Sequence, residues 1–315
     1  MQVPTQSSII RFSMDTLLAT PYGDLIMNED NSILLQKHKD FLTLRDLSDG
    51  TVASYASCMT TFIEWFETNF PQRTIPSITW DEVRAYVRFL KENKKLAPRT
   101  INVHVAQLKD FFHYVLHKEW DKYEVPFVVV DEHLPSVPTK EEVNRIIDST
   151  SNLKHKAMLV LLYSAGIRVS ELCRLHCGDI ISSRKHIYVS RSKNRSDRYA
   201  VLSKKALHVL VLYVREFLKG ATPEDWLFPG QKPSSHVSTE TVRCVFNSQL
   251  HALGMDDKGY TLHSLRHAFG LHLYEAGADL MSIKEAMGHK SLSSTTIYLT
   301  LGIGNGRSVT SPYDL

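Results

Sequence analysis

The sequence predicts a mainly α-helical chain of two domains, the second of which also contains a small β-hairpin. Three observations lead to this fold class. Apolar residues recur at helical spacing over most of the chain, a proline-containing segment interrupts them near the middle, and one stretch of the second half alternates as β-strands do. At 315 residues the chain is long enough for two domains that each bury a core.

The first domain is expected over residues 31–118 and is entirely helical. Between Ile101 and Val115, apolar residues repeat at steps of four and three, which places them along one face of a helix. Thr79 and Glu82 have the spacing of a capping box, so a further helix is expected to begin there. These patterns indicate a small helical bundle.

The remaining boundaries follow from breaks in periodicity. Residues 1–30 show no sustained period and are expected to form an irregular extension. Residues 119–138 contain three prolines and no helical pattern, which is typical of a linker. Thr139 and Glu142 form a second capping box, so we expect the second domain over residues 139–315.

Helical patterns dominate the second domain, with one exception. The segment 186–202 consists of two short β-type runs separated by a polar, basic turn, which predicts a hairpin. The expected helices are 156–165, 204–218, 238–252, 264–277 and 281–287.

Composition narrows the class of protein and the partner. No stretch approaches the roughly 20 apolar residues that span a bilayer, and the N-terminus lacks a secretory pattern, so we expect a cytoplasmic protein without membrane contact. Residues 139–315 hold 23 lysines and arginines against 16 aspartates and glutamates, whereas residues 1–138 hold 14 against 18. A basic second half suits a polyanionic partner.

Two basic features of the second domain could bind an anion. Arg168 lies at the start of an expected helix, where it could grip an anion bidentately or simply pair with Glu171. The hairpin turn could reach into a DNA groove, or could be an ordinary solvated turn. Its basic residues are Arg191, Lys193, Arg195 and Arg198.

Two further motifs could carry chemistry. His263 and Arg266 are three residues apart and share one helix face, which suits a phosphate. A zinc site at His263 and His267 is not favoured, because the arginine between them would repel a cation. His289 and Tyr298 follow in the sequence. Taken singly, His289 would be interpreted as a helix-capping residue and Tyr298 as a half-buried tyrosine of the core.

Together, these motifs resemble the catalytic domain of the tyrosine recombinase (phage integrase) family. The resemblance rests on four boxes in order: SAGIRVSELCRLHCGDI, SKNRSDRYAVL, HSLRHAFGLHLYEAGADL and MGHKSLSSTTIYL. The helical domain resembles the core-DNA-binding domain of that family, which forms a clamp around the duplex with the catalytic domain. The resemblance therefore covers nearly the whole chain beyond the first 30 residues.

The resemblance implies a role for each matched residue. Arg168 and Arg266 would hold the scissile phosphate, and His263 and His289 would add hydrogen bonds to it. His263 would also help to accept the proton of the nucleophile, Tyr298.

The same resemblance implies the leaving-group chemistry and the contacts to DNA. Lys193 would donate a proton to the leaving 5′-oxygen as general acid, and Glu171 would orient the site. Further candidate DNA contacts are Arg191, Arg195, Arg198, Arg99 and Thr100.

Partners and cofactors also follow from the resemblance. The reaction would require no metal and no ATP, so no cofactor is expected. Four protomers would act on two DNA duplexes with inverted-repeat core sites, through a Holliday junction, and accessory proteins could take part. Two alternatives stay open: a type IB topoisomerase-like enzyme that nicks and reseals one strand, and a non-catalytic DNA-binding regulator on the same scaffold. The family often continues past the nucleophile as Tyr-x-His, whereas this chain reads Tyr298-Leu299-Thr300.

Overall fold

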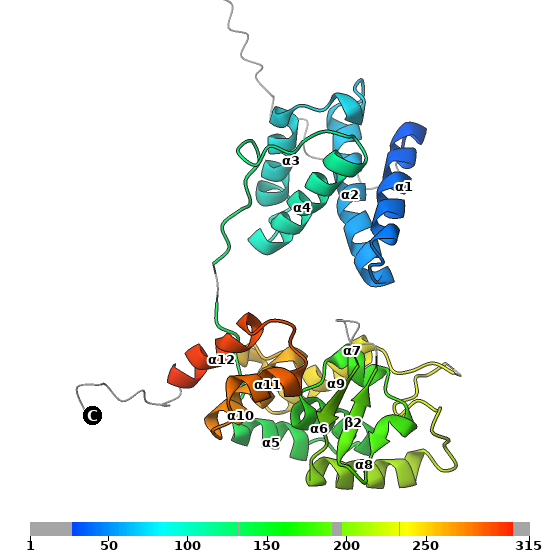
Figure 1. Ribbon diagram of the computed structural model, residues 1–315, viewed down its shortest axis with the longest axis vertical. Helices are drawn as coiled ribbons and strands as arrows, with labels where there is room; N and C mark the ends of the chain where they lie inside the picture. Colours follow the sequence, from blue (N-terminus) through cyan, green and yellow to red (C-terminus); the bar gives the residue numbers. More distant parts are fainter. Residues whose placement is uncertain (1–26, 132, 191–196, 233, 305–315) are drawn as a thin grey trace, which may run out of the picture. The chain divides into compact units, whose positions relative to one another are not determined.

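The chain forms two compact units, which the computed structural model divides at residue 132 (Figure 1). The first unit is Met1–Glu132 and the second is His133–Leu315. The structure describes residues 27–131, 133–190, 197–232 and 234–304.

In the described residues of the first unit, all the regular secondary structure is helical. Its helices are α1 (Glu29–Leu44), α2 (Asp49–Asn69), α3 (Trp80–Glu92) and α4 (Pro98–Tyr114), with a short 3₁₀ turn, η2 (Ile75–Ser77). The capping box predicted at the start of α3 is confirmed, since the Glu82 carboxylate accepts a hydrogen bond from the Thr79 N–H at 2.8 Å.

Aromatic side chains fill the core of this unit. Phe62 of α2 lies edge-on to Tyr86 of α3, with ring centroids 5.1 Å apart, and also meets Phe111 of α4. The predicted apolar stripe of α4, from Ile101 to Phe112, is buried as expected. Large rings at edge-on spacing bury much apolar area, which stabilises a domain of this size.

Part of the segment that follows α4 packs against the same core. Val125 is buried within the core, and Trp120 and Val128 lie against it. The side-chain amide of Asn102 holds the backbone of Val128 twice: its Oδ1 accepts from the N–H, and its Nδ2 donates to the carbonyl, both at 2.8 Å. Residues 120–128 therefore belong structurally to the first unit.

The second unit combines helices with a small sheet (Figure 1). Its elements are α5 (Lys140–Asp148), α6 (Leu153–Ala165), α7 (Val169–Cys173), η3 (Cys177–Asp179), β1 (Ile180–Ile181), β2 (His186–Val189), β3 (Arg198–Val201), α8 (Lys204–Phe217), α9 (Thr239–Ala252), η4 (Asp256–Lys258), α10 (Leu262–Glu275), α11 (Leu280–Met287) and α12 (Ser293–Gly304). The helices expected from periodicity are all confirmed, and so is the fold class of a mainly α chain with a small sheet.

Helix α6 is the centre of this unit. Its residues from Ala157 to Leu162 are all buried, so the helix is apolar on every side, as a helix enclosed by others must be. It contacts α5, α7, α8, α9 and α10. Two segments that carry site residues, α7 and α10, are thus fixed against one rigid helix.

The predicted hairpin is confirmed, and a third strand extends it. The sheet is antiparallel in the order β1-β2-β3, with Tyr188 opposite Tyr199 and Val189 opposite Arg198. The two-residue strand β1 is too short to leave an alternating pattern, so the sequence prediction missed it. The turn at residues 191–196 lies outside the described residues. No helix in the described part of the chain is long and apolar enough to cross a membrane.

Candidate active site

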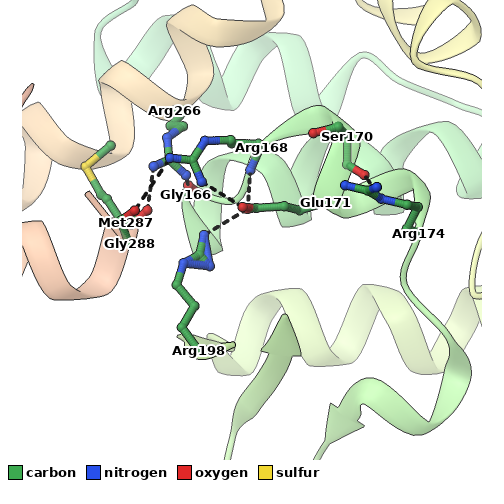
Figure 2. A network of polar contacts seen from close by, with 9 residues as sticks. All are labelled: Gly166, Arg168, Ser170, Glu171, Arg174, Arg198, Arg266, Met287 and Gly288. Carbon is green, nitrogen blue, oxygen red and sulfur yellow. Dashed lines mark hydrogen bonds and ion pairs between the residues drawn. The ribbon is translucent and has the colours of Figure 1, made fainter. Parts of the chain in front are cut away.

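Two helix ends hold the buried Arg266. Gly166 ends α6 and Gly288 ends α11, both in the left-handed conformation that favours glycine at a helix C-terminus. The guanidinium of Arg266, on α10, donates hydrogen bonds to the carbonyls of Gly166 and Met287 (Figure 2). Carbonyls at helix C-termini carry partial negative charge, so they stabilise a cation that is only 2 % exposed.

A single carboxylate organises the other two arginines (Figure 2). Glu171 of α7 accepts from Nη1 of Arg168 at 2.8 Å and from the Arg168 backbone N–H at 2.9 Å. It also accepts from Nη2 of Arg198, at the start of β3, at 2.9 Å. The second terminal nitrogen of Arg168 points to the carbonyl of Gly288 at 3.5 Å. We call Arg168, Arg198, Arg266 and Glu171 the arginine cluster.

The arginine cluster holds more positive than negative charge. The cluster contains three guanidinium groups and one carboxylate. Burial, followed by the charge of Arg168, lowers the pKa of Arg266 to about 10. Burial also lowers the pKa of Arg198. Among the described residues, Nε and Nη1 of Arg198 are buried donors without a hydrogen-bond partner. Surplus charge and spare donors of this kind are what an anion-binding site requires.

A pocket of about 330 Å³ opens beside Arg266. His263 and Arg266 line it, together with residues of α9 and of the segment that leads into α7. The remaining lining residues are Ile167, Val169, Thr239, Glu240, Arg243, Thr261 and Leu262. The pocket is large enough for a phosphate group, and Arg266 presents its charge to it.

Three histidines lie around the cluster in their neutral form. Burial, followed by the charges of Arg266 and Arg168, lowers the pKa of His263, and the same causes lower that of His289 to about 4. Burial also lowers the pKa of His267 to about 4. Nδ1 of His289 lies 2.9 Å from the hydroxyl of Thr295. Neutral imidazoles can donate or accept a hydrogen bond without adding charge.

Tyr298 of α12 is completely buried against α10. Its hydroxyl lies 3.4 Å from Nδ1 of His267, and its ring covers Gly270, where an added Cβ would be 2.5 Å from Cζ. Burial raises the pKa of Tyr298 to about 12, although Arg266 opposes the rise. Tyr298 is not among the residues that line the pocket, and its raised pKa favours the protonated phenol.

The structure brings most of the sequence-predicted site residues into one region. Arg168 and Arg266 meet at the ends of α6 and α11, His263 lines the pocket beside Arg266, and the shifted pKa of His289 reflects the charges of both arginines. Tyr298 adjoins them through α10. These contacts join residues far apart in sequence, so spacing alone could not reveal them.

The predicted DNA contacts fall into three groups. Arg191, Lys193 and Arg195 lie outside the described residues. Arg99 and Thr100 are exposed in the first turn of α4, in the other unit. Arg198, also a predicted DNA contact, lies at the start of β3, where its side chain is 11 % exposed and pairs with Glu171 in the arginine cluster.

Sequence reasoning missed two features of the site. One is the sharing of Glu171 between Arg168 and Arg198, for which the sequence carries no signal. The other is the contact of His267 with Tyr298. Its signal was present, since His267 and Gly270 are one turn apart on the helix that carries His263. Within the described residues, no group of three histidine, cysteine or acidic side chains is arranged to hold a metal.

Comparison with known proteins identifies the family. A model described as "Phage integrase family" matches residues 137–302, and one described as "Phage integrase, N-terminal SAM-like domain" matches residues 34–122. The chain belongs to the phage integrase family. It is thus a tyrosine site-specific recombinase, the enzyme class expected from its four boxes.

Individual relatives agree with the family. A putative integrase/recombinase of Sinorhizobium fredii, y4qK, is 33 % identical over 283 residues, which cover 90 % of this chain and 89 % of the relative. Tyrosine recombinase XerA of Pyrococcus horikoshii is 30 % identical, covering 85 % and 89 %. A solved structure of the XerH site-specific recombinase bound to a palindromic difH substrate has a TM-score of 0.68 at 19 % identity, covering 86 % of this chain and 82 % of that one. At that identity the likeness shows the fold.

Proposed function

We propose that this recombinase cleaves and rejoins DNA through a 3′-phosphotyrosyl intermediate on Tyr298. The observation that carries the proposal is the excess of arginine charge around Arg266 of α10, the helix against which Tyr298 is buried. A phosphodiester is the anion that this charge would receive. The tyrosine is the nucleophile that would attack it.

The arginines would stabilise the transition state. Arg168 and Arg266 would bind the two non-bridging oxygens of the scissile phosphate, where charge grows as the fifth oxygen approaches. Their positions are fixed before substrate arrives, because helix-end carbonyls and Glu171 hold both guanidinium groups. His263 and His289 would add hydrogen bonds as neutral imidazoles.

The bond changes would balance without an outside energy source. The hydroxyl of Tyr298 would give its proton to a neighbouring histidine as its oxygen forms a bond to phosphorus and the bond to the 5′-oxygen breaks. Lys193 would protonate that 5′-oxygen. A 5′-hydroxyl of the partner duplex then attacks the phosphotyrosine and releases the tyrosine. Two such exchanges pass through a Holliday junction.

The partners of this reaction are part of the same proposal. We propose double-stranded DNA with inverted-repeat core sites, bound by four protomers on two duplexes, in the cytoplasm; accessory proteins could assist. Arg99 and Thr100 of α4 would contact the backbone, as would Arg191 and Arg195 of the hairpin turn. Support comes from solved structures of similar fold, whose descriptions include the XerH recombinase with its difH substrate and a lambda integrase dimer on a core site.

The family match over residues 34–122 favours recombination over the two alternatives. An integrase-type helical domain is not needed by an enzyme that only nicks and reseals one strand. A non-catalytic regulator would have no need to keep Tyr298 together with the arginine cluster.

A nicked suicide substrate tests the proposal directly. Nicked duplexes made from the native flanking DNA would be incubated with the wild type and with Tyr298→Phe in excess EDTA, then run on a denaturing gel. We expect a covalent protein–DNA adduct with the wild type alone, while both proteins bind the duplex equally. An adduct with Tyr298→Phe would assign the nucleophile elsewhere. Tight binding with no wild-type adduct would instead indicate a regulator.

A further inference from the structure

The hydroxyl of Tyr298 rests on one turn of α10. Nδ1 of His267 lies 3.4 Å from the hydroxyl oxygen, and the two rings are in an edge-on arrangement with centroids 6.2 Å apart. The same hydroxyl oxygen would be 2.8 Å from a Cβ at position 270, so only a glycine there leaves it this room. The helix thus provides both an acceptor and a space for the phenol.

The histidine that meets Tyr298 is not the one the family resemblance implicates. His263 faces the pocket with Arg266, one turn earlier on α10. Its ring lies edge-on to that of His267, with centroids 4.7 Å apart. His267 therefore stands between the pocket side of the helix and the tyrosine, at hydrogen-bond distance from the oxygen that must lose a proton.

We infer that His267 is a catalytic residue: its Nδ1 accepts the proton of the Tyr298 hydroxyl during DNA cleavage and returns it on rejoining. The inference rests on the proposed function and deepens it. As the tyrosine oxygen bonds to phosphorus, its O–H bond breaks and the proton moves to Nδ1, giving an imidazolium. In the reverse step the phosphotyrosine bond breaks and the imidazolium gives the proton back to the phenolate.

The electrostatics of the free protein explain why the transfer would wait for substrate. Burial lowers the pKa of His267 to about 4 and raises that of Tyr298 to about 12, so the phenol holds the proton more strongly than the imidazole does. The electrostatic influence of His263 and the positive charge of Arg266 add to the burial that lowers the pKa of His267. A phosphate anion would offset these charges and favour the imidazolium. A hydrogen bond of 3.4 Å is long, as such contacts often are before substrate binds.

The test measures single-turnover cleavage against pH for the wild type and His267→Asn. Asparagine keeps an acceptor near the position of Nδ1 but cannot take a proton at these pH values. The substrate carries a sulfur in place of the leaving 5′-oxygen, so that leaving-group protonation does not shape the profile. We expect the variant to bind DNA normally and to cleave about 10² to 10⁴ times more slowly. It should also lose the acidic limb, on which the wild-type rate falls as the imidazole becomes protonated.

Helix α10 supplies a matched control in a second histidine–tyrosine pair. Nδ1 of His272, which is buried, lies 3.0 Å from the hydroxyl of the partly buried Tyr163, outside the arginine cluster. His272→Asn should cleave at the wild-type rate. His267→Gln serves as a second variant if His267→Asn unfolds.

Two outcomes would overturn the inference. One is a His267→Asn rate within threefold of the wild type. The other is a slower rate that keeps the wild-type acidic limb, since this would show that His267 only supports the fold. The wild-type adduct formed in the same series tests the proposed function separately.

Discussion

Arginine–carboxylate pairs differ sharply between the two units. In the first unit an arginine pairs with a carboxylate near the surface: Arg45 pairs with Asp110 at 2.7 Å, with side chains 45 % and 27 % exposed. In the second unit Arg168 and Arg198 share Glu171, whose side chain is 1 % exposed. An exposed pair such as Arg45–Asp110 is balanced and hydrated, whereas the arginine cluster has three guanidinium groups and a single carboxylate.

This difference separates structure from function. An exposed ion pair contributes little to stability, because water solvates both partners nearly as well when they are apart. A buried excess of cations costs stability, and a protein tolerates it where a ligand supplies the missing charge. The cost is reduced here by helix-end carbonyls on Arg266. Charge balance thus distinguishes the binding region from the scaffold.

The largest expected effect is the loss of Glu171. Glu171→Gln leaves the three guanidinium groups of the arginine cluster without the buried carboxylate, so we expect the free energy of unfolding of the second unit to fall by about 3–5 kcal/mol. Urea denaturation measures this. Sodium sulfate should restore part of the loss by supplying an anion.

The matched control lies in the first unit. Asp110→Asn breaks the exposed pair with Arg45 and should cost less than about 1 kcal/mol, with no specific response to sulfate. Equal losses for the two variants would mean that the comparison between buried and exposed pairs is wrong.

A pair of glycines gives the next effect. Gly270 and Gly50 both lie in helices, but an added Cβ meets the Tyr298 ring at position 270 and nothing within 4 Å at position 50. Gly270→Ala should destabilise the second unit by about 1–3 kcal/mol and raise hydrogen exchange in α12. Gly50→Ala should be neutral, or stabilising by about 0.5 kcal/mol, since it lowers the entropy of the unfolded chain. Unchanged stability and exchange in Gly270→Ala would show that Tyr298 does not depend on this space.

The sequence was sufficient for what local patterns determine. The capping boxes at Thr79 and Thr139 and the hairpin strands around the basic turn were all predicted, because each depends on residues within a few positions. The resemblance named the main site residues, but not what holds them. The anchoring of Arg266 by the ends of α6 and α11 joins segments 100 and 21 residues away. Contacts between residues so far apart in the sequence depend on how the helices pack around α6.

The turned-in side chain of Arg198 shows the same limit. In the sequence Arg198 ends a run of basic residues, so a contact with DNA was predicted for it. Its place in the arginine cluster follows from pairing: Arg198 lies opposite Val189, whose side chain is buried, so this end of the hairpin faces the interior. The register of the strands and the side of the sheet on which each side chain lies depend on how the sheet packs in the fold. Alternation over four residues does not specify them.

The smallest expected effect is a change in pKa that distinguishes two histidines, His38 and His289, by the charged groups near them. The pKa of His38 in α1 and that of His289 are both about 4, and burial is the main cause for each. Folding keeps both neutral, so their contribution to stability is present above about pH 6.5 and is lost as the pH falls toward 4. The second cause differs: Arg266 and Arg168 depress His289, whereas the nearby Asp110 raises the pKa of His38.

Anion binding should therefore act on only one of the two. Sulfate in the arginine cluster would offset the charges that face His289 and raise its pKa by about one pH unit, while His38 would not respond. NMR titration of the imidazole Cε1–H signals, with and without sodium sulfate, measures both residues in one sample. A rise at His289 alone would show that the charges of Arg266 and Arg168 help to keep it neutral. Equal shifts at both residues would point to a general salt effect, and would remove the distinction between a histidine kept neutral by burial and one also kept neutral by unbalanced arginines.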